Sequence, residues 1–131
     1  MENETKPSGS RAMFWIGWVL SILASLMLLM SGAMKFMPIT PEVEQGLQHV
    51  GWRADQVGTL GILEIVCTII YLFPKTAVLG AILVTGYMGG AIATHVRVGD
   101  PFIVQAIIPV VFWLGLWLRE PRLRLLVPLR S

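Results

Sequence analysis

Charged residues are scarce in this sequence: they make up 14% of the chain, whereas 55% of its 131 residues are hydrophobic. Soluble domains average about a quarter charged residues, so the shortage indicates a membrane protein. The formal net charge is only +2, and the basic residues flank apolar runs instead of forming a binding face. A nucleic-acid partner is therefore not expected.

Cysteine is almost absent as well. The single Cys67 excludes an internal disulfide and any CxxC redox pair, and therefore thiol–disulfide chemistry within one chain. It lies three residues after Glu64, and a buried small hydrophobic side chain is the expected role. No His, Cys or carboxylate group has the spacing of a metal site, and no nucleophile–base pair or phosphate loop is visible. No catalytic group and no resident metal or cofactor can be assigned, so whether the protein is an enzyme stays open.

Four long apolar runs account for most of the chain. Each has about the 17–25 residues that a helix needs to cross a hydrocarbon core, and they cover residues 12–34, 57–73, 76–94 and 101–118. A soluble core of this size could not bury all four. We therefore predict an all-α fold, a transmembrane four-helix bundle formed by one domain over residues 12–118.

Polar segments flank this domain. Residues 1–11 are predicted to be a disordered tail, and residues 119–131 a basic tail. The first apolar run is longer than a signal-peptide core and three more follow it, so we expect it to be retained as a helix.

The basic residues predict the orientation. Four antiparallel spans put both termini on one side, and seven of the ten Lys and Arg residues fall on that side, against Lys35, Arg53 and Arg97 on the other. The positive-inside rule then places both tails in the cytoplasm. Six aromatic residues fall at the inner ends of the spans and predict an interfacial belt there: Trp15, Trp18, Tyr71, Phe73, Trp113 and Trp117.

The connection 35–56, on the outer side, is the only long one. Thr40-Pro41 is typical of a helix N-cap followed by a first-turn proline, and Gly51 supplies a stop. Val43, Leu47 and Val50 recur at helical spacing between them. We expect a short amphipathic helix that lies on the outer surface or caps the bundle.

Small residues recur every four positions on two spans. Gly17, Ser21 and Ser25 do so on the first, and Gly86 and Gly90 on the third. Such patterns allow close helix approach in lipid, within one bundle or between copies in a homo-oligomer.

Six polar side chains are predicted to gather in the outer half of the bundle. Glu64 lies seven residues inside the outer start of its span, roughly 10 Å deep. The same count places Tyr87 at that level and Gln105 one turn above. Lys35, His95 and Arg97 surround the mouth, and the inner half has no comparable set.

Each of these residues has a structural alternative. An ionised Glu64 facing lipid would cost several kcal/mol, so it must face the interior, be protonated or be paired. It is then either an interhelical hydrogen-bond strut or a contact for a ligand, proton or partner. Tyr87 and Gln105 could serve in helix packing alone. His95, Arg97 and Lys35 could be interfacial anchors.

Three motifs resemble the DoxX-like family of small four-span bacterial membrane proteins. They are SGAMKF at the end of the first span, LGILEI in the second, and FPKTAVLGAILVTGYMGGAIATHVRVGDP across the third. The resemblance covers residues 14–118 and implies the bacterial plasma membrane. The family takes its name from a membrane subunit associated with a thiosulfate:quinone oxidoreductase. The resemblance brings no catalytic residues with it.

Three functions are compatible with these features. The leading hypothesis is a subunit or small-molecule binding module of a membrane redox assembly, with a quinone as the candidate ligand and Glu64 and Tyr87 at its polar head. A proton-relaying oxidoreductase component would need a redox partner protein to supply electrons. A small-solute transporter would need oligomerisation, because four short spans leave little room for alternating access.

Overall fold

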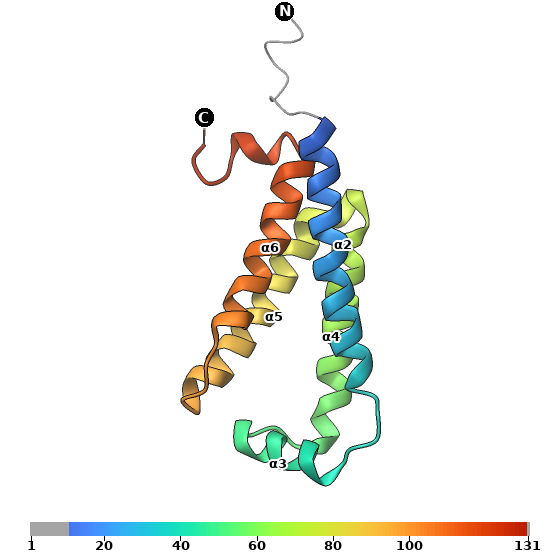
Figure 1. The fold of residues 1–131 in the computed structure, drawn as a ribbon, viewed down its shortest axis with the longest axis vertical. Helices are drawn as coiled ribbons and strands as arrows, with labels where there is room; N and C mark the ends of the chain where they lie inside the picture. The colour runs from blue at the N-terminus through green and yellow to red at the C-terminus, as the bar shows by residue number, and fades with distance from the viewer. Residues whose placement is uncertain (1–10, 131) are drawn as a thin grey trace, which may run out of the picture.

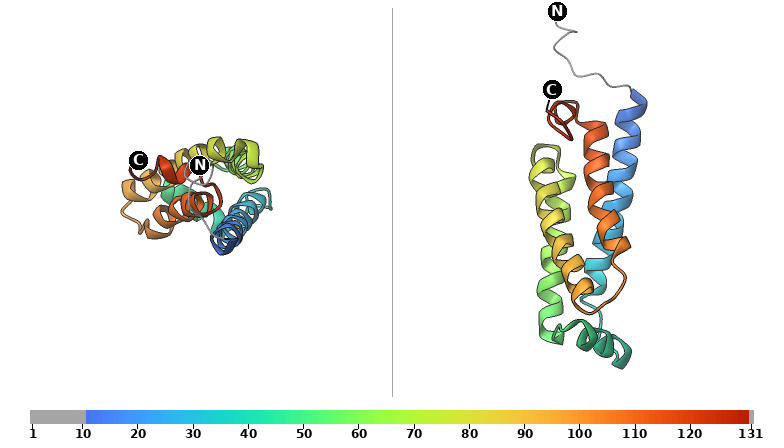
Figure 2. Two further views of the ribbon diagram at one scale, coloured as in Figure 1. Left: turned by 90° about the horizontal axis from the view of Figure 1, so that it is seen from above. Right: turned by 90° about the vertical axis from the view of Figure 1, so that its left-hand side faces the viewer.

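The computed structural model describes residues 11–130, and within that range it contains helices and no strand. Four long helices follow one another along the chain: α2 (Arg11–Met34), α4 (Ala54–Leu72), α5 (Ala77–Arg97) and α6 (Ile103–Arg119). Both α2 and α5 pack against α4 and α6 (Figure 2). The all-α prediction is confirmed for the described residues.

The helix bounds differ from the predicted runs at two functionally important ends. Helix α5 continues three residues beyond position 94, so His95 and Arg97 belong to its last turn. Helix α6 continues to Arg119, which was predicted to begin the basic tail. Residues 1–10 of the predicted N-terminal tail lie outside the described residues, whereas Arg11 begins α2.

The short helix α3 (Pro41–Val50) lies across one end of the molecule, which we call the α3 end (Figure 1). Its predicted signals are confirmed: the Thr40 hydroxyl accepts a hydrogen bond from the Val43 amide at 3.3 Å. Gly51 ends the helix at φ +88°, a left-handed conformation that glycine adopts without strain. Toward this end the α2–α4 pair and the α5–α6 pair spread apart (Figure 1).

The opposite end, which we call the terminal end, holds the start of α2 and the end of α6. Two 3₁₀ turns lie there, η1 (Pro74–Thr76) between α4 and α5, and η2 (Leu123–Leu125) after α6. The segment after α6 folds back on the helices, because Trp117 Nε1 donates to the Val127 carbonyl at 2.7 Å. Leu123 is buried there, so part of the predicted tail closes this end of the molecule.

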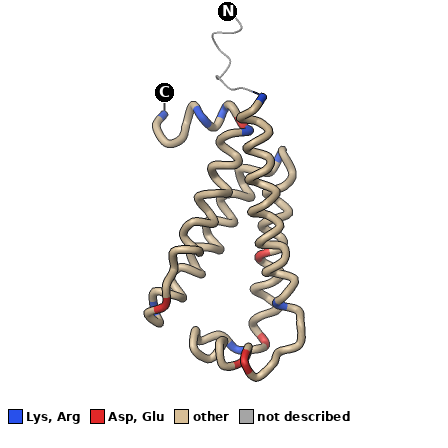
Figure 3. The backbone as a smooth tube through the Cα atoms, viewed as in Figure 1, with Lys and Arg blue, Asp and Glu red and all other residues tan. Residues whose placement is uncertain are grey.

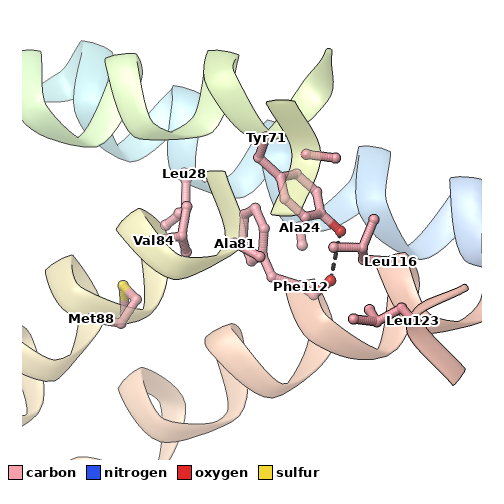
Figure 4. Close-up of a cluster of buried hydrophobic side chains, with 10 residues drawn as sticks. Ala24, Leu28, Tyr71, Ala81, Val84, Met88, Phe112, Leu116 and Leu123 are labelled. Atoms are coloured by element: carbon pink, nitrogen blue, oxygen red, sulfur yellow. Dashed lines mark hydrogen bonds between the residues drawn. The ribbon is translucent and has the colours of Figure 1, made fainter. Parts of the chain in front are cut away.

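The hydrophobic core occupies the terminal half (Figure 4). The rings of Tyr71 and Phe112 meet edge to face, with centroids 4.6 Å apart. The Tyr71 hydroxyl donates to the Phe112 carbonyl at 2.6 Å. Apolar side chains from α2, α5, α6 and η2 complete the core around this pair: Ala24, Leu28, Ala77, Ala81, Val84, Met88, Leu116 and Leu123.

The two small-residue patterns have different outcomes. Gly17 on α2 packs against α6, because a Cβ at this position would lie 2.6 Å from the Gly115 carbonyl oxygen. Packing within one chain is therefore confirmed for this pattern. Gly86 and Gly90 do not pack against another helix of the same chain, because a Cβ on either would meet no described atom within 4 Å, and contact between copies stays a prediction.

The outer faces of the helices are apolar. Large hydrophobic side chains such as Met30, Ile62, Ile82 and Val110 are more than half exposed. Charged residues lie mainly toward the two ends (Figure 3). Three described helices, Arg11–Met34, Ala54–Leu72 and the η1–α5 segment Pro74–Arg97, are long and apolar enough to cross a membrane, and α6, with 17 residues, is shorter. Exposed apolar surface of this extent indicates a protein that contacts lipid.

Candidate functional site

The carboxylate of Glu64 is paired inside the molecule. Only 2% of this α4 residue is exposed, and Lys35, just beyond the end of α2, places its Nζ 2.7 Å from Glu64 Oε1. Lys35 also donates to the Ser31 hydroxyl at 3.0 Å. The side chain of Lys35 therefore turns inward to neutralise the carboxylate and does not act only as an interfacial anchor.

Tyr87 completes this group from α5. Its hydroxyl donates to Glu64 Oε1 at 3.0 Å, as expected if the two residues lie at one depth. Oε1 thus accepts two hydrogen bonds, one from a cation and one from a phenol. We call Ser31, Lys35, Glu64 and Tyr87 the polar cluster.

A cavity of about 950 Å³ adjoins the polar cluster. It lies in the α3 half of the molecule, where the helix pairs spread apart. Its volume falls at the upper end of the range for small-molecule sites, about 300–1,000 Å³. Gly86 and Gly90 lie on its wall, where the missing side chains leave space. Most of the remaining lining is apolar: Met27, Leu28, Met34, Val43, Leu47, Trp52, Met88 and Ile108.

Two further predicted residues line the cavity without contacting the polar cluster. The Gln105 side chain, from α6, has no hydrogen-bond partner among residues 11–130. The structure therefore does not show the helix–helix tether that was its alternative role. His95 Nδ1 lies 2.7 Å from the Ala91 carbonyl oxygen, which can only accept, so this nitrogen carries the hydrogen.

Arg97, the sixth predicted residue, does not line the cavity. Its guanidinium donates to the Val50 carbonyl at the end of α3. A second contact joins α3 to the α5–α6 loop, where His49 Nε2 lies 2.9 Å from an Asp100 carboxylate oxygen. Because Val43, Leu47 and Val50 face the cavity, α3 covers it and is held there by these two contacts.

His49→Ala is expected to loosen α3 without unfolding the protein. None of the ten α3 residues is buried, so the helix depends on its few contacts. An exposed ion pair contributes about 0.2–1 kcal/mol, which corresponds to hydrogen exchange up to about fivefold faster in the α3 amides. Gln48→Ala, on the same exposed turn, is the control. Equal exchange in the two variants would show that the His49–Asp100 contact does not hold α3.

A second buried polar group lies at the terminal end, where none was expected. Ser21 Oγ lies 2.9 Å from the Tyr71 hydroxyl and accepts from Arg119 Nε at 3.1 Å. Tyr71 is fully buried and Arg119 is 8% exposed. The prediction that the inner half holds no comparable set is therefore wrong, and Tyr71 does not belong to an interfacial belt.

The arginine in this group is held mainly by aromatic rings. Its guanidinium carbon lies 4.0 Å from the Trp18 ring centroid and 5.1 Å from that of Tyr71. Its Nη2 is buried and has no partner among the described residues. Arg119 does not line the cavity of about 950 Å³, and its contacts with Ser21, Trp18 and Tyr71 tie α2, α4 and α6 together.

Glu120 and Arg122, beside the second cleft of about 480 Å³ at the terminal end, are paired with each other, whereas Lys75, which also lines this cleft, is exposed. Arg122 Nε donates to Glu120 Oε1 at 3.1 Å. Burial raises the pKa of the Glu120 carboxyl, but the hydrogen bonds and charge of Arg122 outweigh burial and hold that pKa below its ordinary value. Glu120 and Arg122 therefore already have partners, and neither needs one from a ligand.

These features define a helical membrane protein with a neutralised carboxylate beside a large apolar cavity. No group of three His, Cys, Asp or Glu residues within 11–130 could hold a metal ion. The sequence model of the DoxX-like family matches residues 19–118, and the chain belongs to this family. Comparison with curated proteins finds no match, and neither does comparison with solved structures.

Proposed function

We propose that this protein binds an apolar small molecule with a polar head, of the quinone class, in the cavity of the α3 half. The observation that carries the proposal is the polar cluster beside an otherwise apolar cavity of about 950 Å³. Binding sites of this kind use an apolar lining for affinity and a few polar groups for orientation. The head of the ligand would contact Glu64 and Tyr87.

The cavity distinguishes a binding site from a purely structural strut. A buried ion pair that only joined helices would be surrounded by closely packed side chains, since protein interiors leave few voids larger than water. Here Gly86 and Gly90 leave the wall of α5 open beside it. The divergence of the helix pairs creates the space, and these two glycines leave it unfilled on the α5 side.

The proposed placement is the bacterial plasma membrane, crossed by all four long helices. Helix α6 has 17 residues, the lower limit for a span. The excess of Lys and Arg at the terminal end supports a cytoplasmic location for both termini. The cavity and α3 then lie on the outer side of the bilayer.

The proposed role is that of a subunit in a membrane redox assembly. The sequence shows no haem, flavin or thiol-pair signature, so a partner protein would supply the electrons. The cavity would hold the ligand while the partner carries out the redox step. Proton transfer through Glu64 is compatible with this role, because its carboxylate borders the cavity.

Gly86→Leu is expected to abolish occupancy of the cavity. A leucine at this position would project into the open space where a Cβ now meets nothing within 4 Å. We would extract the protein gently from the membranes of its own host and record native mass spectra and an absorption spectrum. The wild type should carry a quinone or another apolar small molecule, and Gly86→Leu should have lost at least about nine tenths of it.

Gly89→Leu is the matched control. Gly89 lies on the same helix and is equally free of neighbours, but it does not line the cavity. This variant should keep the bound molecule. A wild type without any small molecule, or equal loss in both variants, would contradict the proposal. A bare chain bound stoichiometrically to another protein would instead indicate a structural subunit.

A further inference from the structure

The hydrogen-bonding capacity left free by the polar cluster restricts the ligand head. Glu64 Oε1 accepts from Lys35 and from Tyr87, whereas Oε2 has no donor within hydrogen-bond distance among residues 11–130. Only 2% of Glu64 is exposed, and the residue lines the cavity, so a ligand reaches its free oxygen from the cavity. A carboxylate oxygen of this kind needs a donor.

The ammonium group of Lys35 in the polar cluster already donates to acceptors within the protein. Lys35 Nζ lies within hydrogen-bond distance of Glu64 Oε1, Ser31 Oγ and the Ser31 carbonyl, at 2.7, 3.0 and 3.5 Å. An ammonium group has three hydrogens, so the first two contacts leave it at most one weakly used donor. The Tyr87 hydroxyl has used its hydrogen on Glu64, and its oxygen can still accept.

Ser31 contributes a second donor. Its oxygen accepts from Lys35, and its own hydrogen has no acceptor among the described residues and can be offered to a ligand. The cluster therefore presents free acceptors on Glu64 and Tyr87, with the Ser31 hydroxyl and one weakly used N–H of Lys35 as donors beside them. A carbonyl head could use only donors, and an ammonium head could use only acceptors.

The charge of the ligand head distinguishes the two kinds of head that can donate a hydrogen bond, an ammonium group and a hydroxyl. The Lys35–Glu64 pair is neutral overall, and a second cation placed against Oε2 would lie close to the Lys35 ammonium. Like charges at such short range are unfavourable in a medium of low polarity. A hydroxyl avoids this repulsion, can donate to Oε2 and can accept from Ser31.

The geometry points to a neutral hydroxyl head, an alcohol, phenol or hydroquinone, as the ligand that this site selects over a carbonyl of the same shape. This inference rests on the proposed binding function and narrows it. Within the quinone class, the reduced form would bind more tightly than the oxidised form. A hydroxyl donating to a carboxylate makes a charge-assisted bond, about twice as strong as a neutral one.

The test compares two stable probes of matched size, 4-dodecylphenol and its methyl ether, 4-dodecylanisole. Binding to the full-length protein in nanodiscs is measured by native mass spectrometry. Each affinity is expressed per mole fraction of probe in the bilayer, because the two probes partition differently. The phenol should bind at least about tenfold more tightly than the ether, as loss of one charge-assisted hydrogen bond predicts.

Substitutions in the protein test whether Glu64 causes the preference for the phenol over the ether. Lys35→Met with Glu64→Gln removes both charges together, so no lone charge stays buried, and it should reduce the preference to about threefold or less. Thr59→Val, at an exposed position of α4 that does not line the cavity, should leave the preference unchanged. A preference that persists in the double variant would overturn the assignment to Glu64.

The outcomes separate this inference from the proposed function. Equal binding of the two probes, or tighter binding of the ether, would overturn the hydroxyl preference and leave the cavity as a binding site. Tighter binding of 4-dodecylbenzylamine than of the phenol would overturn the neutral head. If neither probe binds and Gly86→Leu changes nothing, the binding function fails and this inference fails with it.

Discussion

Gly80→Ala is expected to destabilise the protein by about 3 kcal/mol or more, because the helices α4 and α5 touch at this residue. A Cβ on Gly80 would lie 2.3 Å from both the N and Cα atoms of Tyr71. Backbone atoms cannot rotate away as a flexible side chain can, so the two helices would have to separate. The separation would also disturb the Tyr71–Phe112 pair in the core. Thermal unfolding in detergent measures the loss.

Gly89→Ala is the control for this prediction. Both glycines lie within α5, and alanine is favoured over glycine in a helix by about 1 kcal/mol. Nothing lies within 4 Å of a Cβ on Gly89, so this variant should be as stable as the wild type or slightly more stable. Equal loss in the two variants would show that close approach to Tyr71 is not what requires Gly80.

Lys35→Met should destabilise the protein by about 3 kcal/mol, since it leaves the carboxylate of Glu64 without its cation. Glu64 is 2% exposed, and the Tyr87 hydroxyl would be the one hydrogen-bond donor left to its carboxylate among the described residues. Equilibrium unfolding in detergent would show the loss. The double variant that adds Glu64→Gln should recover most of it, because no charge is then left buried.

Lys75→Met tests whether loss of any lysine has this effect. Lys75 is exposed in η1, and no ion pair of Lys75 is seen within the described part of the chain. Its variant should change stability by less than about 0.5 kcal/mol. If Lys35→Met is equally mild, the Lys35–Glu64 pair adds little to stability, and the polar cluster would have to be explained by ligand binding alone.

Local signals and helix depth were predictable from the sequence. Thr40, Pro41 and Gly51 identify α3 because caps act through the nearest backbone groups. The depth of Glu64 and Tyr87 follows from the constant rise of a helix, so counting residues from the span ends placed both at one level. Their hydrogen bond agrees with that count.

Features that depend on how the helices tilt were not predictable. Gly86 and Gly17 belong to similar patterns, yet Gly17 contacts α6 and Gly86 borders a cavity, because α5–α6 and α2–α4 diverge toward α3. The partner of Arg97 depends on where a loop places α3. The contact between Ser21 and Arg119 joins residues 98 positions apart, and the sequence placed Arg119 only at the start of the basic tail.

The packing of Tyr71, Phe112 and Leu123 in the core at the terminal end bears on membrane permeability. Tyr71 and Phe112 are fully buried, and Leu123 from η2 is buried in the same core, so packed side chains lie between the cavity and the terminal end. A proton or solute that reaches Glu64 from the α3 end therefore meets these packed side chains before the terminal end. If the chain crosses the bilayer as proposed, it could take up a ligand from one leaflet while these packed side chains preserve the electrochemical gradient across the bilayer.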